Sequence, residues 1–583
     1  MFDSLKLLVK NLLAATLLLA FLISNTSTGD EEKAPIINYK TRFLPEIGKN
    51  GMVVGPEKLA TEIGLSILKD GGNAIDAAVA TGFALAVTYP RAGNLGGGGF
   101  MLIHRQNENQ QTLIDYRETA PLGAQSDMFL DESGKVDRSR IYFSHLAAGV
   151  PGTVAGLLMA LEQYGTLPVE VVIKPAIKLA LEGFPVSYAL NYEINSRAKR
   201  LAENPEAAKL FLTSEKSAPP IGSIFKQGEL ANTLMRISKE GHDGFYRGLT
   251  AKFINDEMDS AGGLITTRDL NGYAAVERTP VRQTFRDYEI VSTPPPSSGG
   301  IHIIQMLNIL EELDLQGMRL NSAKYIHYLT ESMKRAYADR SKYLGDSDFI
   351  HVPVTELISK EYANTIGKEI LPNKASPSET ISPGVVQAQE SQDTTHFTVA
   401  DRFGNVVTNT YTLNFSFGSH IAVPGTGLLL NNEMADFAAR PGVANAYGLL
   451  EGQANGIVPG KRPLSSMSPT MVMQNGSAIL ATGSPGGSII ITTVLQVILN
   501  SLVFDMNIAS AAAQPRIHHQ WLPDILRVEP GIGPDTIDIL EQMGHNVTTS
   551  SRTLGRTQSI ALKDGWLYGA TDSRRAGGHV ASY

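Results

Sequence analysis

A threonine at the start of a strand is the first residue of this sequence that could do chemistry. Thr394 follows an acidic linker ending in Asp393 and precedes the β-rich residues Thr395-His396-Phe397. A self-cleaving enzyme would be cut here, because the cut places a free α-amino group beside the threonine hydroxyl. On this interpretation the encoded chain is a precursor, and the active enzyme forms only after the cut.

The residues that follow Thr394 predict a β-hairpin. Residues 396–400 and 406–413 have strand-forming composition, and the turn cluster 401–405 separates them. A symmetric hairpin with this loop pairs residue 398 with residue 408.

The same register places Thr394 opposite Thr412 at the open end of the hairpin. Because side chains alternate between faces with period two, Thr412 and Asn414 point to the same face as Thr394. Taken alone, this polar face is either a solvated threonine-rich surface or part of a site.

A glycine-rich cluster at 482–488 precedes the apolar run 489–495. The pattern predicts a strand, a tight turn and a helix whose first N–H groups have no partner of their own. Gly486 and Gly487 would let a ligand approach those amides closely, as an oxyanion hole requires. A simple strand-to-helix turn is the alternative. A phosphate loop is excluded, since no Gly-Lys-Ser or Gly-Lys-Thr follows.

Seven motifs in order make this chain resemble the γ-glutamyltranspeptidase (γ-glutamyltransferase) family of N-terminal nucleophile hydrolases. The resemblance covers nearly everything after the first 35 or so residues. The matching segments are residues 94–100, 115–118, 393–396, 411–414, 431–436, 462–469 and 483–487.

This resemblance implies catalytic roles. Thr394 is the expected nucleophile, and its hydroxyl first attacks the Asp393 carbonyl to give an ester that water opens. The new α-amino group, with a reference pKa of about 8, is then the general base for that hydroxyl. Thr412 is expected to support the nucleophile, and Gly486 and Gly487 to supply the oxyanion-hole amides.

The resemblance also implies how a γ-glutamyl group is held. Its α-carboxylate is expected to meet Arg117, Ser465 and Ser466. Its α-ammonium is expected to meet Asn414, Glu433 and Asp436. An acyl group without the ammonium would leave carboxylates unpaired, at a cost of roughly 1–3 kcal/mol each.

The implied activity is cleavage of γ-glutamyl amides such as glutathione, with transfer of the γ-glutamyl group to amino acids, dipeptides or water. No cofactor or metal is expected. One alternative is a cephalosporin or glutaryl-amide acylase of the same fold, although Glu433, Asp436 and the paired serines disfavour it. A non-catalytic exported relative is the other alternative, and failure to split would support it.

Residues 437–448, rich in small residues, Pro and Gly, resemble the lid loop of some family members. Tyr447 stands in the place of the covering aromatic residue, and a plain surface loop is the alternative. A lid would keep water from the acyl-enzyme and so favour transfer over hydrolysis.

The elements that must position these residues are expected to form one large α/β unit, because no domain-separating linker interrupts the 583 residues. Residues 57–68 and 74–87 predict helices that alternate with short β-rich runs. The resemblance implies a four-layer αββα sandwich, with a large subunit of residues 29–393 and a small catalytic subunit of residues 394–583.

The N-terminus predicts export. Lys6 and Lys10 precede an apolar run of twelve residues, 12–23, which is shorter than the about 20 that a membrane span needs. We therefore expect a signal peptide over residues 1–28 and no stable membrane span, with an uncleaved anchor as the alternative. The chain has no cysteine, which suits a bacterial periplasm without proving it. Its net charge of −8 argues against nucleic-acid binding.

Three histidines invite a chemical role but are predicted to be packing residues. His518 and His519 are adjacent and therefore lack the i, i+4 spacing of a helical zinc pair. His396 lies beside the nucleophile, yet the expected mechanism already has its base.

Overall fold

Two antiparallel sheets form the centre of the protein. The computed structural model describes residues 43–381, 394–443, 445, 449 and 452–583. Residues Pro45–Tyr583 form one compact unit that contains both sheets, each of seven strands. In spatial order, the first sheet consists of β1 (Glu46–Gly48), β20 (Trp566–Thr571), β19 (Gln558–Lys563), β15 (Ser477–Thr482), β14 (Thr470–Gln474), β9 (Tyr288–Ser292) and β8 (Val281–Phe285). The second consists of β21 (His579–Ser582), β2 (Gly51–Gly55), β10 (Thr395–Asp401), β11 (Val406–Thr412), β3 (Gly98–Arg105), β4 (Gln110–Asp115) and β7 (Val276–Arg278).

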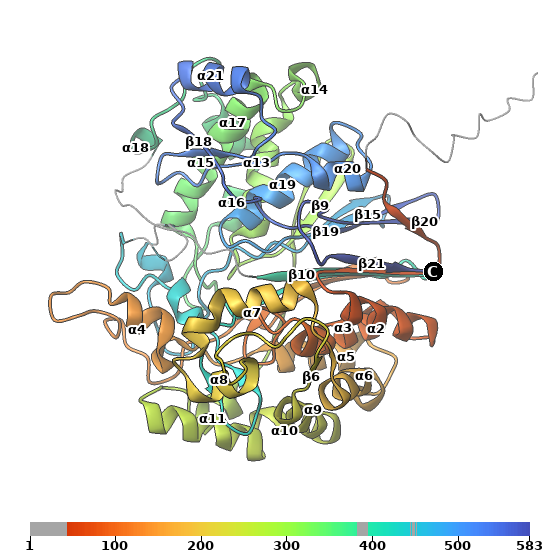
Figure 1. Cartoon of the computed structure of the whole chain (residues 1–583). Helices are drawn as coiled ribbons and strands as arrows, with labels where there is room; N and C mark the ends of the chain where they lie inside the picture. The colour runs from red at the N-terminus through yellow and green to blue at the C-terminus, as the bar shows by residue number, and fades with distance from the viewer. Residues whose placement is uncertain (1–42, 382–393, 444, 446–448, 450–451) are drawn as a thin grey trace, which may run out of the picture. The chain divides into compact units, whose positions relative to one another are not determined.

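Helices cover the outer face of each sheet. Helices α13 (Gly299–Glu311), α15 (Ala323–Tyr343) and α19 (Ile489–Leu502) lie above the strands in Figure 1. Helices α2 (Lys58–Lys69), α3 (Ala74–Thr88), α5 (Thr153–Tyr164) and α6 (Val169–Glu182) lie below them. The order of layers is therefore helices, sheet, sheet, helices, as the family resemblance implies.

Alternate residues of a central strand belong to different cores. In β2, Met52 and Val54 pack into the core that contains residues of the first sheet and of α13, α15 and α19. Val53, between them, packs into the core that contains α2, α3, α5 and α6. Both faces of this strand are thus buried in apolar surroundings, which explains why it reads as a continuous apolar run.

The two helices predicted near the N-terminal end are confirmed as α2 and α3. The Glu57 carboxylate accepts hydrogen bonds from the first backbone N–H groups of α2. Asn73 and Asp76 form a capping box at the start of α3. Close packing of α2 against α3 explains the glycine at position 64, because a Cβ there would lie 2.3 Å from Thr81 Oγ1 of α3.

Residues 1–28, the predicted signal peptide, lie outside the described residues. No helix within the described ranges is both long and apolar enough to cross a membrane.

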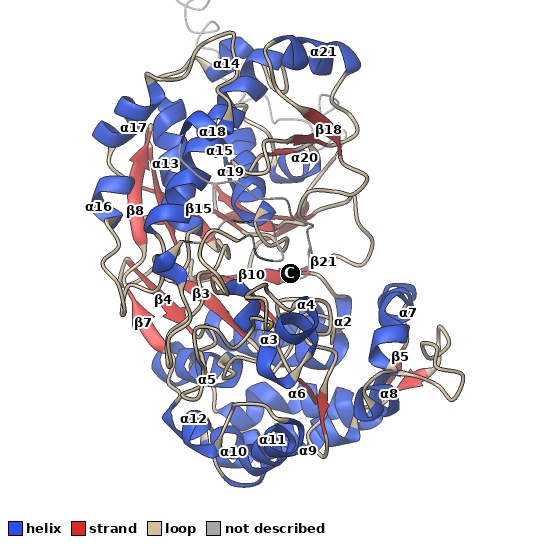
Figure 2. Ribbon diagram, turned by 90° about the vertical axis from the view of Figure 1, so that its left-hand side faces the viewer, coloured by secondary structure: helices blue, strands red, loops and turns tan. Residues whose placement is uncertain are grey.

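The second sheet alternates between strands from the two sides of residue 394. Strands β2, β3, β4 and β7 precede this position in the chain, whereas β10, β11 and β21 follow it. In the sheet, β10 and β11 lie between β2 and β3, and Figure 2 shows β10, β3, β4 and β7 following one another across the layer.

Candidate active site

The hairpin that carries Thr394 has the predicted register. Thr398 pairs with Thr408, and Thr395 pairs with Tyr411. Extending the register by one residue places Thr394 opposite Thr412. The Asp401 carboxylate stabilises the turn by accepting hydrogen bonds from the backbone of residues 403 and 405, at 2.8 and 3.0 Å.

The glycine run before β3 fixes the end of β11. A Cβ at Gly97 would lie 1.9 Å from the Thr412 carbonyl oxygen. The Asn94 side chain joins the two segments, since its Nδ2 donates to that oxygen at 3.0 Å and its Oδ1 accepts from the Gly97 N–H at 2.8 Å. The run therefore positions Thr412 through close backbone approach and need not touch a substrate.

His396 packs the glycine-rich turn against the nucleophile strand. A Cβ at Gly483 would lie 2.2 Å from the His396 ring, so only glycine fits. The ring nitrogens bond the Thr410 hydroxyl at 2.7 Å and the Thr398 hydroxyl at 3.2 Å. Burial lowers the pKa of His396 to about 3, so the ring is neutral. These contacts confirm that His396 is a packing residue.

The turn between β15 and α19 presents two backbone amides. Gly486 has φ +135° and Gly487 has φ +55°, and L side chains rarely adopt the first of these conformations. Their carbonyls accept from the N–H groups of Ile489 and Ile490 at 3.1 and 3.2 Å. Within the described residues, neither the Gly486 nor the Gly487 N–H donates a hydrogen bond. Both remain able to bind an oxyanion.

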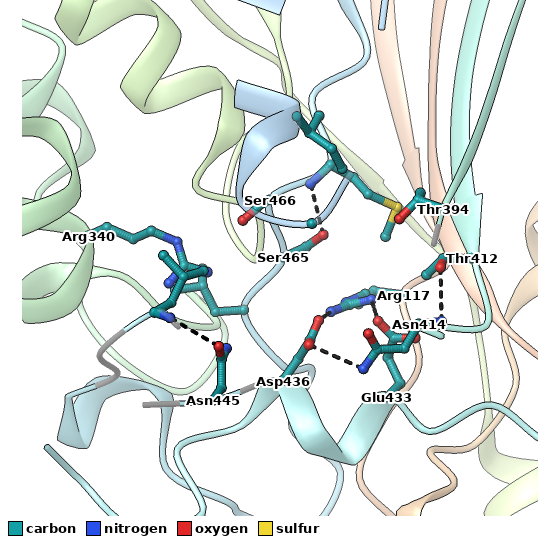
Figure 3. A pocket seen from close by; sticks show the side chains of 15 residues that line it. Arg117, Arg340, Thr394, Thr412, Asn414, Glu433, Asp436, Asn445, Ser465 and Ser466 are labelled. Carbon is teal, nitrogen blue, oxygen red and sulfur yellow. Dashed lines mark hydrogen bonds and ion pairs between the residues drawn. The ribbon is translucent and has the colours of Figure 1, made fainter. Parts of the chain in front are cut away.

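One small cavity brings together residues from distant segments of the chain (Figure 3). Its volume is about 20 Å³, roughly the room for one water molecule. The predicted site residues that line it are Thr394, Thr412, Gly487, Arg117, Asn414, Glu433, Asp436, Ser465 and Ser466. Gly486 is next to this lining, and Tyr447 lies outside the described residues.

Arg117 is ion-paired with the two carboxylates that were predicted to hold an ammonium. Its guanidinium bonds Glu433 through Nη1 and Asp436 Oδ2 through Nη2, the latter at 2.6 Å. Asn414 Nδ2 donates to the other Asp436 oxygen at 3.2 Å. Arg117 Nε donates to the Pro463 carbonyl at 3.2 Å, which fixes the plane of the guanidinium. Figure 3 shows these side chains pointing toward one another below the two threonines.

A third carboxylate, Glu118, also faces this guanidinium, at 3.5 Å. Among the described residues, one oxygen of Glu118 and one of Glu433 are buried without a hydrogen-bond partner. Burial raises the pKa of Glu433 well above its usual range and that of Glu118 to about 7, although Arg117 opposes both shifts. The buried cluster is therefore short of positive charge.

Ser465 and Ser466 are held by the proline-rich segment 294–300, which leads into α13. The Ser465 N–H donates to the Pro296 carbonyl at 2.8 Å. The Ser465 carbonyl accepts from both the N–H and the hydroxyl of Ser298, each at 2.9 Å. This rigid turn aligns the serine pair along the cavity wall.

Six lining residues were not predicted as part of the site: Arg340, Asn445, Leu449, Leu464, Met467 and Ile490. Arg340 comes from α15 and donates through Nε to the Ser298 hydroxyl at 3.0 Å. A lone arginine inside a long helix carries no local sequence signal. Asn445 lies inside, and Leu449 just beyond, the segment that resembles a lid.

His518 and His519 serve packing, as predicted. His518 bonds the Thr492 hydroxyl at 2.9 Å, and His519 bonds the Asp524 carboxylate at 3.1 Å.

A four-layer sandwich with a threonine before a central strand, next to unpaired turn amides, defines the class of N-terminal nucleophile hydrolases. Within this class, the family model described as gamma-glutamyltranspeptidase matches residues 60–582. The chain therefore belongs to the γ-glutamyltranspeptidase family.

Three relatives illustrate the similarity. The glutathione hydrolase proenzyme of Escherichia coli (strain K12) is 50% identical over 94% of this chain and 95% of its own length. The crystal structure of Helicobacter pylori gamma-glutamyltranspeptidase is 44% identical, with a TM-score of 0.56 over 61% of this chain and 99% of that chain. The cephalosporin acylase from Bacillus halodurans is 28% identical, with a TM-score of 0.83 over 94% of this chain and 98% of that chain.

Proposed function

We propose that this enzyme cleaves the γ-glutamyl amide bond of glutathione and related compounds and transfers the γ-glutamyl group to amino acids, dipeptides or water. The observation that carries the proposal is one guanidinium surrounded by three buried carboxylates, in a cavity shared with Thr394. A γ-glutamyl group supplies the ammonium that this cluster lacks.

The substrate's charges can exchange with those of the site. Its α-carboxylate takes a place on the Arg117 guanidinium, with the hydroxyls of Ser465 and Ser466 beside it. Its α-ammonium then pairs with the released carboxylates of Glu433 and Asp436, and Asn414 holds Asp436 in position. The ammonium favours ionised carboxylates and thus reverses the effect of burial on the pKa of Glu433.

The precursor cuts itself at Asp393/Thr394. The Thr394 hydroxyl attacks the Asp393 carbonyl, the peptide C–N bond breaks, and water opens the resulting ester. The products are a large subunit of residues 29–393 and a small subunit of residues 394–583. Asp393 itself lies outside the described residues. The Escherichia coli relative is a glutathione hydrolase proenzyme, which supports such processing.

Turnover reuses the same hydroxyl. The freed α-amino group of Thr394 takes its proton, and the oxygen attacks the γ-carbonyl of the substrate. The amides of Gly486 and Gly487 stabilise the oxyanion, the amine departs with the proton, and a γ-glutamyl ester remains. An acceptor amine or water then cleaves this ester. The Thr412 hydroxyl, which accepts from the Asn414 N–H at 2.8 Å, supports the nucleophile.

Two further proposals concern access and location. The segment 437–448 acts as a lid over the acyl-enzyme, with Tyr447 as its covering ring. Asn445 supports this role because it lines the cavity. The signal peptide over residues 1–28 directs the protein to a bacterial periplasm.

The test compares chromogenic γ-glutamyl and glutaryl anilides, which differ only in the α-ammonium. A strong preference for the γ-glutamyl compound is expected, because the glutaryl compound leaves Glu433 and Asp436 without a counter-ion. Comparable rates on the two anilides would favour the second candidate function, that of an acylase. The similarity to a cephalosporin acylase is the observation that supports this candidate. Cleavage of neither would contradict both.

A further inference from the structure

A second cavity, much larger than the catalytic pocket, has a lining rich in arginine. Its volume is about 970 Å³, and seven arginines line it together with one carboxylate, that of Glu193. The whole chain carries a net charge of −8, so this concentration of positive charge runs against the composition. A cleft of one charge sign focuses the electrostatic field and attracts ligands of the opposite sign.

The positive charge of this arginine cleft is only partly neutralised. Arg91 pairs with Glu193, and Arg200 pairs with Glu203 at 2.7 Å. Arg574 pairs with Glu529 and, at 2.8 Å, with Asp572. Within the described residues, however, no carboxylate pairs with Arg552. The surplus is located on the side of the cleft formed by residues 552–556.

Arg556 is the buried part of that surplus. It also has no carboxylate partner in the described part of the chain, and its guanidinium donates instead to the Ala576 carbonyl at 2.8 Å and the Pro56 carbonyl at 3.3 Å. Its Nε is buried without a partner. Burial, followed by the nearby charges of Arg91 and Arg556, lowers the pKa of Arg575. Like charges are therefore crowded here, and an anion would relieve the repulsion.

The walls of the cleft and of the catalytic pocket are connected at two places. Asn414 lines the pocket, and the next residue, Phe415, lines the cleft. On the other side, the Arg556 N–H donates to the Ser484 hydroxyl at 2.9 Å, two residues before the oxyanion amide of Gly486. Cleft residues are thus joined, along the chain or by a hydrogen bond, to both the substrate-binding side and the oxyanion turn of the pocket.

Two exposed tyrosines also line the arginine cleft. Tyr188 and Tyr192 of α7 (Tyr188–Leu201) stack with ring centroids 6.4 Å apart and are 68% and 59% exposed. Arg200 lies on the same helix, over the Phe143 ring at 4.2 Å. Aromatic faces beside guanidinium groups suit a peptide that carries both carboxylates and apolar atoms.

We infer that the arginine cleft binds the part of the substrate beyond the scissile amide and selects leaving groups and acceptors that are anionic peptides. The inference rests on the proposed function, which places the γ-glutamyl end in the pocket and leaves the cleft for the other end. Arg552 and Arg200 are the specificity-determining residues of this subsite.

The experiment compares two donors that share the γ-glutamyl group: γ-glutamyl-4-nitroanilide, with a neutral leaving group, and γ-glutamyl-3-carboxy-4-nitroanilide, with an anionic one. The variant is Arg200→Gln/Arg552→Gln in the full chain. We expect kcat/KM for the carboxylated donor to fall about fivefold to tenfold, given a few-fold per exposed ion pair, and that for the neutral donor to change less than about twofold.

Arg268→Gln is the matched control, because Arg268 is exposed on α12 (Thr267–Gly272) and lines neither cavity. It removes one positive charge and should leave the ratio of the two donors unchanged. An equal loss on both donors in the double variant, or no loss, would overturn the inference. If the parent enzyme cleaves neither donor, the proposed function fails and the inference falls with it.

Discussion

The two cavities of this protein handle charge in opposite ways. In the catalytic pocket, about 20 Å³ in volume, Arg117 is buried and ion-paired with three carboxylates, those of Glu118, Glu433 and Asp436. In the arginine cleft, about 970 Å³ in volume, seven arginines and a single carboxylate face a space that admits water. Buried charges discriminate steeply, because an unpaired group cannot be rescued by solvent. Solvated charges discriminate weakly, because water and salt screen them.

This contrast predicts strict selection of the acyl group and permissive selection of its partner. The pocket rejects an acyl group that lacks either charge of the zwitterion. The cleft only ranks leaving groups and acceptors by their charge. The same enzyme can then act on many γ-glutamyl compounds while remaining specific for the γ-glutamyl end.

The largest effect is expected for Thr394→Ala. This variant should remain a single chain on a denaturing gel and lose at least about a thousandfold in kcat/KM, since both cutting and turnover need the hydroxyl. Thr395→Ala is the control, because the adjacent hydroxyl is equally buried and has no partner within the described residues. Two subunits in the Thr394→Ala protein would remove Thr394 from its role.

The next effect tests the buried charges of the pocket. Asp436→Asn should lower kcat/KM for a γ-glutamyl anilide by about 10-fold to 100-fold. Its kcat/KM for the glutaryl anilide should stay nearly unchanged, so the ratio of the two values should fall. Asp348→Asn is the control: Asp348 pairs with Arg278 at 2.7 Å, but its side chain is 46% exposed. Its loss should change either rate less than about twofold. An unaltered preference in Asp436→Asn would contradict the ammonium assignment.

A smaller effect is expected at the oxyanion turn. Gly486→Ala imposes a side chain on φ +135°, a strain of about 1–3 kcal/mol that moves the amide from its position. We expect kcat to fall about tenfold with little change in KM. Gly71→Ala is matched, because Gly71 has φ +100° and open space where the Cβ would be. It should lower the melting temperature and leave kcat intact; a similar kcat loss there would mean that the effect is general.

The smallest expected effect is a difference between the two cavities in how salt changes substrate preference. Raising NaCl from about 50 to 500 mM shortens the screening length from roughly 14 to 4 Å. The preference for the carboxylated over the neutral donor should fall about twofold to threefold. The preference for γ-glutamyl over glutaryl anilide should stay constant, because its charges are buried. Parallel changes in both ratios would mean that the two cavities do not differ as described.

The sequence predicts what depends on local periodicity and on the order of motifs. The alternation after Thr394 is enough to place it opposite Thr412, and two glycines before an apolar run are enough to predict the amide turn. The family resemblance then supplies Arg117 and the carboxylates. Asp393 and Tyr447 lie outside the described residues, so their roles stay predictions.

What the sequence does not predict depends on contacts between distant segments. The pairing of Arg117 with Glu433 joins residues 316 positions apart. Arg340 reaches the pocket only because α15 crosses behind Ser298. The arginine cleft combines residues near 91, 200, 415 and 552–576. Because these residues are far apart in the sequence, no local sequence pattern predicts that their charges gather in one place.

The alternation of strands in the second sheet bears on how the halves are made. Each piece released by the proposed cut contributes strands that lie between strands of the other, so neither could bury its sheet edges alone. Separately synthesised halves should aggregate, and a cut made before folding should be as harmful as a deletion. Folding of the uncut chain therefore has to pair the strands of both halves first. The cut at Asp393/Thr394 then follows once those strands are hydrogen-bonded in one sheet.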